Sequence, residues 1–322
     1  MASRRISTII ATRDQPAALV STLGSLFRQQ RPPDEVIVVD DGSGPDTPHA
    51  LQHWRSRQPF QGPVLRYRYQ TAQGGSAAFN QGVADSSGDL LLFMAGEALL
   101  EAEALRHLED ALSTAPASAV AVASLANLHA RGQWPAATGP TVTPPEGRPS
   151  QRLADLIAGH WVAPLHGCLF TREAVSRIGP WDSRFRLPRV DDLLFRAVLR
   201  GVEFLPAPEA LAYCRAEERT AVSGHLSRGD STKGLDLKDD LAIHDQVFLE
   251  LRARGAHERM RAAFEAWHRA LGERYGEAWR GVNESDWSVL SWLATVRPEH
   301  PRGRVTLGRR TIAQVSLPRT LS

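Results

Sequence analysis

The sequence has little cysteine, no long apolar run and no excess of one charge. Its 322 residues include only two cysteines, Cys168 and Cys214, which excludes a disulfide framework and a cysteine-based zinc site and is typical of a reducing compartment. We therefore expect buried free thiols in a cytoplasmic protein. No apolar stretch approaches the length of a membrane-spanning helix, and charge interrupts the N-terminal segment too soon for a signal peptide. Because 38 basic residues face 36 acidic ones and the arginines are scattered, nucleic acid is not an expected partner.

Several common catalytic motifs are also missing. No glycine-rich dinucleotide fingerprint follows the first expected strand, since residues 11–20 (ATRDQPAALV) contain no glycine, and this disfavours a Rossmann dehydrogenase. There is no Walker A loop, no HExxH pair and no GxSxG elbow. These absences remove the main support for a phosphate-loop NTPase, a zinc protease or an α/β-hydrolase.

What the sequence does contain is an alternation of short apolar runs and amphipathic segments. We expect strands at residues 6–10, 35–39, 64–69, 89–94 and 118–125. We expect helices from about residue 16 and at residues 47–56, 76–85 and 103–113, and a later helix that Gly201 ends. Strands that alternate with helices at such short spacings are typical of βαβ units and predict a parallel sheet.

Two segments lack any apolar period. Residues 130–151 are rich in proline and glycine and are expected to form a loop, and residues 223–236 (SGHLSRGDSTKGLD) are a second candidate for a mobile segment. Beyond them the chain turns helical. We place a domain boundary near Gly224, with a main domain at 1–224 and a mainly helical extension at 225–322 that serves as a lid, packs on the main domain or mediates homodimer formation.

The stretch VIVVDDGSGPDT (residues 36–47) carries two carboxylates directly after an apolar run. Such a run, bounded by turn residues, is typical of a strand covered on both faces. In open α/β sheets ligands bind beyond the carboxyl ends of the strands, so Asp40 and Asp41 stand where a ligand is expected. The alternative is that residues 41–43 only form a turn and that Thr47 caps the next helix.

Four segments in this order resemble a known family. They are residues 7–44, 73–105 (QGGSAAFNQGVADSSGDLLLFMAGEALLEAEAL), 167–185 (GCLFTREAVSRIGPWDSRF) and 191–201 (DDLLFRAVLRG). Together they are similar to the inverting glycosyltransferases of family 2. The resemblance implies an α/β fold of the GT-A type, with a Rossmann-like mixed sheet and helices on both faces. It also implies transfer of a sugar from a nucleotide-diphosphate-sugar donor to a hydroxyl of a carbohydrate or other acceptor.

The resemblance further implies a donor site at the strand ends. Ala11, Thr12 and Arg13 match the family segment that lines the nucleotide base, and Asp40 matches the carboxylate that hydrogen-bonds this base. Asp41 is expected to hold the adjoining loop. The other residues matched to the donor site are Gly74, Asn80, Gly96 and Arg215.

The sequence departs from the family at the metal and diphosphate positions. Relatives carry an Asp-x-Asp type motif where this chain has residues 95–97, and Glu97 falls at the position that ligates the metal. One carboxylate, diphosphate oxygens and waters would form a Mg²⁺ or Mn²⁺ shell, with Glu217, or else Glu218, in place of a histidine of relatives. The alternative is that Glu97 only caps the next turn. Phe79 stands where relatives often have an arginine that would pair with the diphosphate.

A third departure concerns the catalytic base. Inverting transfer needs a carboxylate that removes the proton of the acceptor hydroxyl. Relatives place it in a Glu-Asp pair that is matched here by Arg189 and Val190. Asp191 is the nearest candidate base, one residue further on, and Asp192 matches a later aspartate of the same helix. Alternatively, both aspartates only cap the first turn of this helix.

Aromatic residues and the three departures leave further alternatives open. Trp161, His166 and Trp181 flank the segment that faces acceptors in relatives, and aromatic faces suit sugar rings, although core packing is favoured for Trp181. The departures are also those expected of a degenerate subunit that binds nucleotide or glycan and supports a partner enzyme. A nucleotidyltransferase ranks last, because only Arg13 follows the first strand as a basic residue.

Overall fold

The computed structural model describes residues 4–58, 62–95, 98–128, 147–161, 163, 165–185, 187–215, 229–295, 304–307 and 310–313. The chain forms two compact units. One unit comprises Met1–Arg152 and Trp161–Leu226, and the other comprises Leu153–His160 and Ser227–Ser322. The expected boundary at Gly224 lies outside the described residues.

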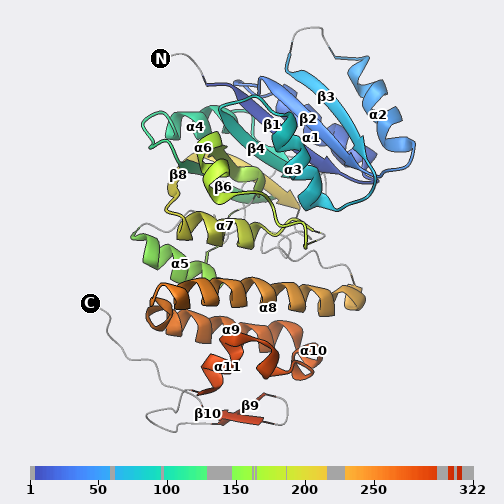
Figure 1. Cartoon of the computed structure of the whole chain (residues 1–322). Helices are drawn as coiled ribbons and strands as arrows, with labels where there is room; N and C mark the ends of the chain where they lie inside the picture. The colour runs from blue at the N-terminus through green and yellow to red at the C-terminus, as the bar shows by residue number, and fades with distance from the viewer. Residues whose placement is uncertain are drawn as a thin grey trace. The chain divides into compact units, whose positions relative to one another are not determined.

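The first unit is built on an eight-stranded mixed sheet with the strand order β3-β2-β1-β4-β7-β6-β8-β5 (Figure 1). Its parallel half is β1 (Ile6–Thr12), β2 (Glu35–Asp41), β3 (Val64–Gln70) and β4 (Leu90–Ala95). Its other half is β5 (Leu99–Leu100), β6 (Ala119–Leu128), β7 (Cys168–Thr171) and β8 (Glu203–Arg215). The mixed sheet implied by the family resemblance is confirmed.

The predicted parallel pairing holds for β1 to β4, and antiparallel pairing begins beyond β4. Strand β7 pairs antiparallel with both β4 and β6, and β5 pairs antiparallel with β8. The βαβ pattern of the first 95 residues fixes strand direction only where one helix connects two strands that follow each other in the sequence. Strand β7 instead enters the sheet between β4 and β6 after a long connection, so the local pattern carries no information about its direction.

The helices of this unit cover both faces of the sheet. They are α1 (Pro16–Phe27), α2 (Asp46–Arg55), α3 (Gly75–Asp85), α4 (Ala104–Ala111), α6 (Arg172–Ile178) and α7 (Val190–Leu199). The residues of α5 (Pro149–Ile157) are divided between the two units. Successive side chains of β1 point to opposite faces of the sheet. Ile10 packs in the core cluster with Leu23 of α1, whereas Ile9 faces α3, where Gly82 leaves no room for a β-carbon. Helix α3 can therefore lie directly on the strand.

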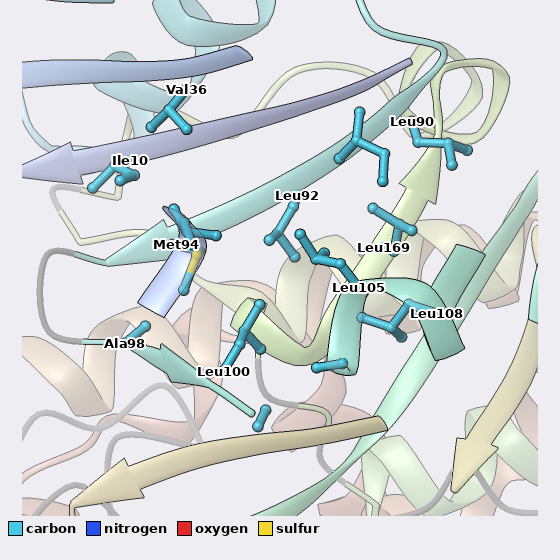
Figure 2. Packing of buried hydrophobic residues seen from close by; sticks show 14 of the residues in the cluster. Ile10, Val36, Leu90, Leu92, Met94, Ala98, Leu100, Leu105, Leu108 and Leu169 are labelled. Atoms are coloured by element: carbon cyan, nitrogen blue, oxygen red, sulfur yellow. The ribbon is translucent and has the colours of Figure 1, made fainter. Parts of the chain in front are cut away.

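Leucines dominate the core between the sheet, α1 and α4. Figure 2 shows Leu92, Leu105 and Leu169 pointing toward one another from β4, α4 and β7. All three are inaccessible to solvent, and full burial of such a side chain contributes about 1.5–3 kcal/mol. Cys168 is likewise buried, as expected, and burial raises its pKa above the ordinary value.

The second unit is mainly helical. It contains α8 (Gly229–Ala253), α9 (Arg261–Tyr275), α10 (Glu277–Arg280), α11 (Ser288–Thr295) and a hairpin of β9 (Arg304–Leu307) with β10 (Arg310–Ala313). Asp240 of α8 is buried and accepts a hydrogen bond of 2.6 Å from the Tyr275 hydroxyl of α9. Among the described residues, no helix is both long and apolar enough to cross a membrane.

Two loop predictions need correction. Helix α8 begins at Gly229, so the second half of the expected mobile segment 223–236 is helical, while residues 223–228 lie outside the described residues. Helix α5 begins at Pro149, inside the expected loop 130–151, of which residues 130–146 are not described. In both places the helix starts with polar, glycine or proline residues that lack an apolar period, and the apolar residues that fix the helix follow later.

Candidate functional site

Two adjacent carboxylates lie at the carboxyl edge of the parallel half of the sheet. Asp40 and Asp41 end β2, where Asp40 is in register with Thr12 of β1 and with Tyr69 of β3. The carboxyl ends of parallel strands meet at one edge, which is where ligands of open α/β sheets bind. The structure thus brings together the predicted residues Ala11, Thr12, Asp40 and Asp41.

Asp40 is held by two uncharged hydrogen-bond donors. The Ser43 amide donates to Oδ1 over 2.8 Å, and the Tyr67 hydroxyl donates to Oδ2 over 2.7 Å. Asp40 has no exposed surface, whereas Tyr67 of β3 is 37% exposed. Burial, together with the hydrogen bond to Asp40, raises the pKa of Tyr67 above its ordinary value, so its hydroxyl is a donor at neutral pH. Tyr67 is a site residue that the sequence reasoning missed.

Asp41 organises the loop between β3 and α3. Its Oδ1 accepts hydrogen bonds of 2.8 Å from the Gln70 side chain and from the Gln73 amide, and its Oδ2 accepts one of 2.9 Å from the Gly74 amide. Gly74 has a φ of 100°, which other residues rarely adopt. These contacts are those of a residue that holds its loop, the role expected for Asp41, and they place Gly74 at the start of α3.

A second set of hydrogen bonds ties the loop after β1 to the loop after β2. The Asp14 amide donates to Ser43 Oγ over 2.8 Å, and Asp14 Oδ1 accepts from the Gly44 amide over 2.9 Å. Asp14 has a φ of 51°, a left-handed conformation that aspartate tolerates better than most residues. The neighbouring Arg13 is exposed. Asp14 was not among the predicted site residues, and only the observed loop geometry identifies it.

Two of the positions in α3 face the protein interior. The side-chain amide of Asn80 both donates to and accepts from the main chain of Trp181, over 2.9 and 2.8 Å. Phe79 is buried, and its ring lies 5.4 Å from that of Phe93 and 5.1 Å from that of Trp181. Trp181 therefore packs in the core. The position at which relatives often have an arginine holds a core aromatic residue.

The two carboxylates at the start of α7 are each paired with an arginine. Arg189, itself buried, donates from Nε and Nη2 to the two oxygens of Asp191 over 3.1 and 2.6 Å. Arg196 donates to Asp192 Oδ2 over 3.1 and 2.6 Å and also holds the carbonyl groups of Ile178 and Pro180. The Asp191 side chain is 22% exposed and that of Asp192 only 7%. Burial raises the pKa of Asp192, while Arg196 opposes the shift.

The start of α7 lies against the start of α3. A β-carbon added to Gly75 would come within 2.8 Å of the Pro188 ring, one residue before Arg189. The loop that Asp41 holds and the segment that carries Asp191 are therefore in direct contact within the first unit.

Trp161 is a core residue of the first unit, and His166 is half-buried. The Trp161 ring packs edge-on against Phe204 at 5.1 Å. The His166 Nε2 atom lies 3.1 Å from the Tyr213 carbonyl oxygen, and burial lowers the pKa of His166 to about 4. Its imidazole is consequently neutral near pH 7.

Several predicted metal and donor residues fall outside the described part of the chain. Gly96, Glu97, Glu217 and Glu218 are among them, and Arg215 is the last residue of β8. Ala95, the first residue of the altered metal motif, is exposed at the end of β4 and supplies no ligand atom from its side chain. Within the described ranges, no group of three or more His, Cys, Asp or Glu side chains is arranged to hold a metal ion.

With this geometry in hand, comparison with known proteins decides the family. The model of "Glycosyl transferase family 2" matches residues 7–179, more than half of the chain. The chain belongs to this family. The resemblance noted in the sequence is thereby confirmed. The family 2 match covers every strand of the parallel half of the sheet and both loops tied by Asp14.

Relatives of this family 2 chain are distant in sequence. An "uncharacterized glycosyltransferase alr2836" from Nostoc sp. (strain PCC 7120) is 22% identical over 244 residues, which cover 74% of this chain and 72% of the relative. TarS 1-349 of S. aureus, solved with UDP-GlcNAc, is 16% identical with a TM-score of 0.59 and covers 88% of this chain and 77% of its own. This chain spans 46% of the longer TarS structure.

A second solved structure extends the comparison. The mannosyltransferase PcManGT from Pyrobaculum calidifontis, in complex with GDP-Man and Mn²⁺, is 16% identical with a TM-score of 0.51, over 92% of this chain and 80% of its own. At such identities the likeness concerns the fold. The fold of the GT-A type, with its mixed sheet and surrounding helices, is confirmed.

Proposed function

We propose that this protein transfers a sugar from a nucleotide-diphosphate-sugar donor to an acceptor hydroxyl with inversion. The observation that carries the proposal is the pair Asp40–Asp41 at the carboxyl edge of the parallel strands, framed by the loops after β1, β2 and β3. Membership of a glycosyltransferase family supports the reaction class. Two similar structures contain UDP-GlcNAc and GDP-Man, which supports a nucleotide sugar as the donor.

Asp40 would accept a hydrogen bond from the nucleotide base. An ionised carboxylate only accepts hydrogen bonds, and its two oxygens together accept about four. Ser43 and Tyr67 use two of these positions. The remaining capacity suits a base that presents a ring N–H, as uracil and guanine do. Because Asp40 is fully covered in this structure, the base must displace a neighbouring group to reach it.

Asp191 would act as the general base and Asp192 as a positioning residue. In the reaction the acceptor oxygen forms a bond to the anomeric carbon, the bond from that carbon to the diphosphate breaks, and the acceptor proton passes to the carboxylate. Asp191 is the more exposed of the two, and each of its oxygens keeps a second lone pair beyond the bond from Arg189. Asp192 is buried and locked to Arg196.

A divalent cation, Mg²⁺ or Mn²⁺, would neutralise the departing diphosphate. The described residues do not form a metal site by themselves, so no step above depends on the ion. Glu97 and Glu217 are the residues that we propose as ligands, together with diphosphate oxygens and waters. A cytoplasmic location and homodimer formation through the C-terminal helices also belong to this proposal.

One set of observations favours a second candidate, a nucleotide-binding subunit without turnover. Val190 occupies the position of the family base, and Phe79 packs in the core where relatives often carry a cation. Both oxygens of the replacement carboxylate Asp191 already accept bonds from Arg189. Such a subunit would retain the Asp40 site and lack the chemistry at α7.

The test combines binding with turnover. Melting temperature is measured with UDP, GDP, CDP and ADP, with and without Mn²⁺, because a ligand bound only by the folded state raises it. Hydrolysis of UDP-sugars and GDP-sugars is then followed for the wild type, Asp191→Asn and Glu97→Ala. We expect nucleotide binding by all three proteins, metal-dependent turnover by the wild type, and loss of turnover in Asp191→Asn.

Three outcomes are informative. Binding without turnover by the wild type would favour the second candidate. Turnover that survives in Asp191→Asn would remove Asp191 as the base. A wild type that binds none of the four nucleotides would contradict both candidate functions.

A further inference from the structure

The amino-acid sequence alone does not predict one contact at the proposed donor site. The Tyr67 hydroxyl reaches from β3, the outermost strand on this side of the sheet, to the buried Oδ2 atom of Asp40 over 2.7 Å. The tyrosine is 37% exposed and the aspartate is not exposed at all. A residue on the outer strand thus sets the environment of the most deeply buried carboxylate of the site.

The contact matters because a buried carboxylate oxygen without a donor is costly. Ser43 serves Oδ1 and Tyr67 serves Oδ2, so loss of the Tyr67 hydroxyl would leave Oδ2 without a described donor. A buried carboxylate in that state lowers its free energy by taking up a proton or by rotating toward another donor. A protonated carboxyl group can donate as well as accept.

Donor or acceptor character at this position decides which base can bind. Uracil and guanine present a ring N–H at the edge used in base pairing, whereas cytosine and adenine present a ring nitrogen that only accepts. An ionised carboxylate can accept the ring N–H of uracil and guanine. A protonated carboxyl group can also donate to the ring nitrogen of cytosine and adenine. Discrimination between the two classes therefore depends on keeping Asp40 an acceptor.

We propose that Tyr67 is a positioning residue that sets the base selectivity of the donor site by holding Asp40 as an acceptor-only carboxylate. The inference rests on the proposed function, since it requires that a nucleotide binds at Asp40. It assigns a specificity role to a residue that does not itself touch the base.

The chain provides a matched control two residues away. Tyr69 lies on the same strand and, by the alternation of a strand, on the same face as Tyr67. It is 56% exposed, its Cα is the register partner of Asp40, and its hydroxyl makes no hydrogen bond with a described residue. Tyr67→Phe and Tyr69→Phe thus remove the same atom from neighbouring positions, with and without the bond to Asp40.

The experiment measures dissociation constants of UDP, CDP, GDP and ADP by calorimetry for the full chain and both variants. We expect the wild type to prefer UDP over CDP and GDP over ADP. In Tyr67→Phe these preferences should fall about tenfold, as expected for one hydrogen bond to a charged group. Tyr69→Phe should keep the wild-type ratios. Melting temperatures check that each variant is folded.

The ratios separate selectivity from general damage. Equal weakening of all four nucleotides in Tyr67→Phe, or unchanged ratios, would overturn the proposal. Absence of nucleotide binding by the wild type would instead contradict the proposed function. If Tyr67→Phe does not fold, Tyr67→Leu serves as a second variant without a donor. Tyr67→Gln, which keeps a donor, should retain more of the wild-type ratio than Tyr67→Leu.

Discussion

The first unit contains two Asp-Asp pairs, and their partners differ in charge. Asp40 and Asp41 accept hydrogen bonds from backbone amides, a tyrosine hydroxyl and a glutamine amide, all of them neutral. Asp191 and Asp192 are each held by an arginine. Neutral donors fix the orientation of a carboxylate and leave its charge in place, whereas a guanidinium largely cancels the charge. The same dipeptide thus forms a buried anionic pair at one place and two neutral ion pairs at the other.

The largest expected effect comes from removing an arginine that is paired with an aspartate of the second pair. Arg196→Met should lower the free energy of unfolding by about 3–5 kcal/mol, because it leaves the buried Asp192 carboxylate without its partner. Denaturant unfolding measures the loss. The double variant Asp192→Leu/Arg196→Met is the control. It should lose less stability than Arg196→Met, because it leaves no buried carboxylate unpaired, but it still loses the bonds from Arg196 to the carbonyl groups of Ile178 and Pro180. A single variant as stable as the wild type would show that Asp192 does not depend on Arg196.

Any comparison of the two pairs at acidic pH must allow for two histidines whose pKa values are lowered by burial. Burial lowers the pKa of His166 and of His268 to about 4, compared with about 6.5 in an unfolded chain. The unfolded state then binds more protons between these values, so stability falls as the pH falls. Going from pH 7 to pH 5 should cost about 2 kcal/mol for each histidine.

Unfolding curves across this pH range test the expectation. His268→Gln removes one of the two groups and should reduce the loss by about 2 kcal/mol. An exposed histidine, His49, provides the control variant His49→Gln for the effect of the substitution itself. A wild type that is equally stable at pH 5 and pH 7 would contradict the buried state of both imidazoles.

Within the first pair, Asp41 should contribute to the stability of the fold through its three hydrogen bonds to the loop between β3 and α3. Asp41→Ala removes three hydrogen bonds to Gln70, Gln73 and Gly74 and should cost about 3 kcal/mol. Nucleotide affinity should fall as well, because the loop that borders the site loses its anchor. Asp41→Asn keeps one acceptor oxygen and is expected to lie between Asp41→Ala and the wild type in unfolding experiments. Equal stability of Asp41→Ala and wild type would show that the loop does not need this anchor.

The first pair could be predicted from the sequence and the partners of either pair could not. An apolar run that ends in two carboxylates places Asp40 and Asp41 at a strand end whatever the rest of the chain does. That Tyr67 meets Asp40 depends on the register between β2 and β3, and no short turn fixes this register. Arg189 was matched to a family carboxylate position, so its pairing with Asp191 became visible only in the structure.

The same reasoning explains the other differences. The parallel half of the sheet follows from helices that connect consecutive strands of the chain, while β7 arrives from a distant part of the chain. The start of α8 at Gly229 has no periodic apolar residues, so its sequence predicts a loop. Asp14 adopts its left-handed conformation because two loops meet there, which is a tertiary cause.

The loop that Asp41 anchors touches the segment that precedes Asp191, and one glycine tests whether this contact matters. Asp41 binds the Gly74 amide, and the next residue, Gly75, packs so closely on Pro188 that a β-carbon would lie 2.8 Å from its ring. Gly75→Ala should push Pro188 away and displace the adjoining Arg189–Asp191 pair. We expect turnover to fall about tenfold or more, because small displacements of a reacting group are costly, while nucleotide dissociation constants stay unchanged.

Gly24→Ala in α1 is the matched control for this last variant. There the added β-carbon would meet only the end of the Arg28 side chain, which can move, and alanine favours a helix over glycine by up to about 1 kcal/mol. Gly24→Ala should therefore keep full turnover with equal or higher stability. If Gly75→Ala weakens nucleotide binding and leaves turnover per bound donor intact, the strain is relieved on the Asp41 side. In that case the α3 start, and not the α7 start, is the softer of the two segments.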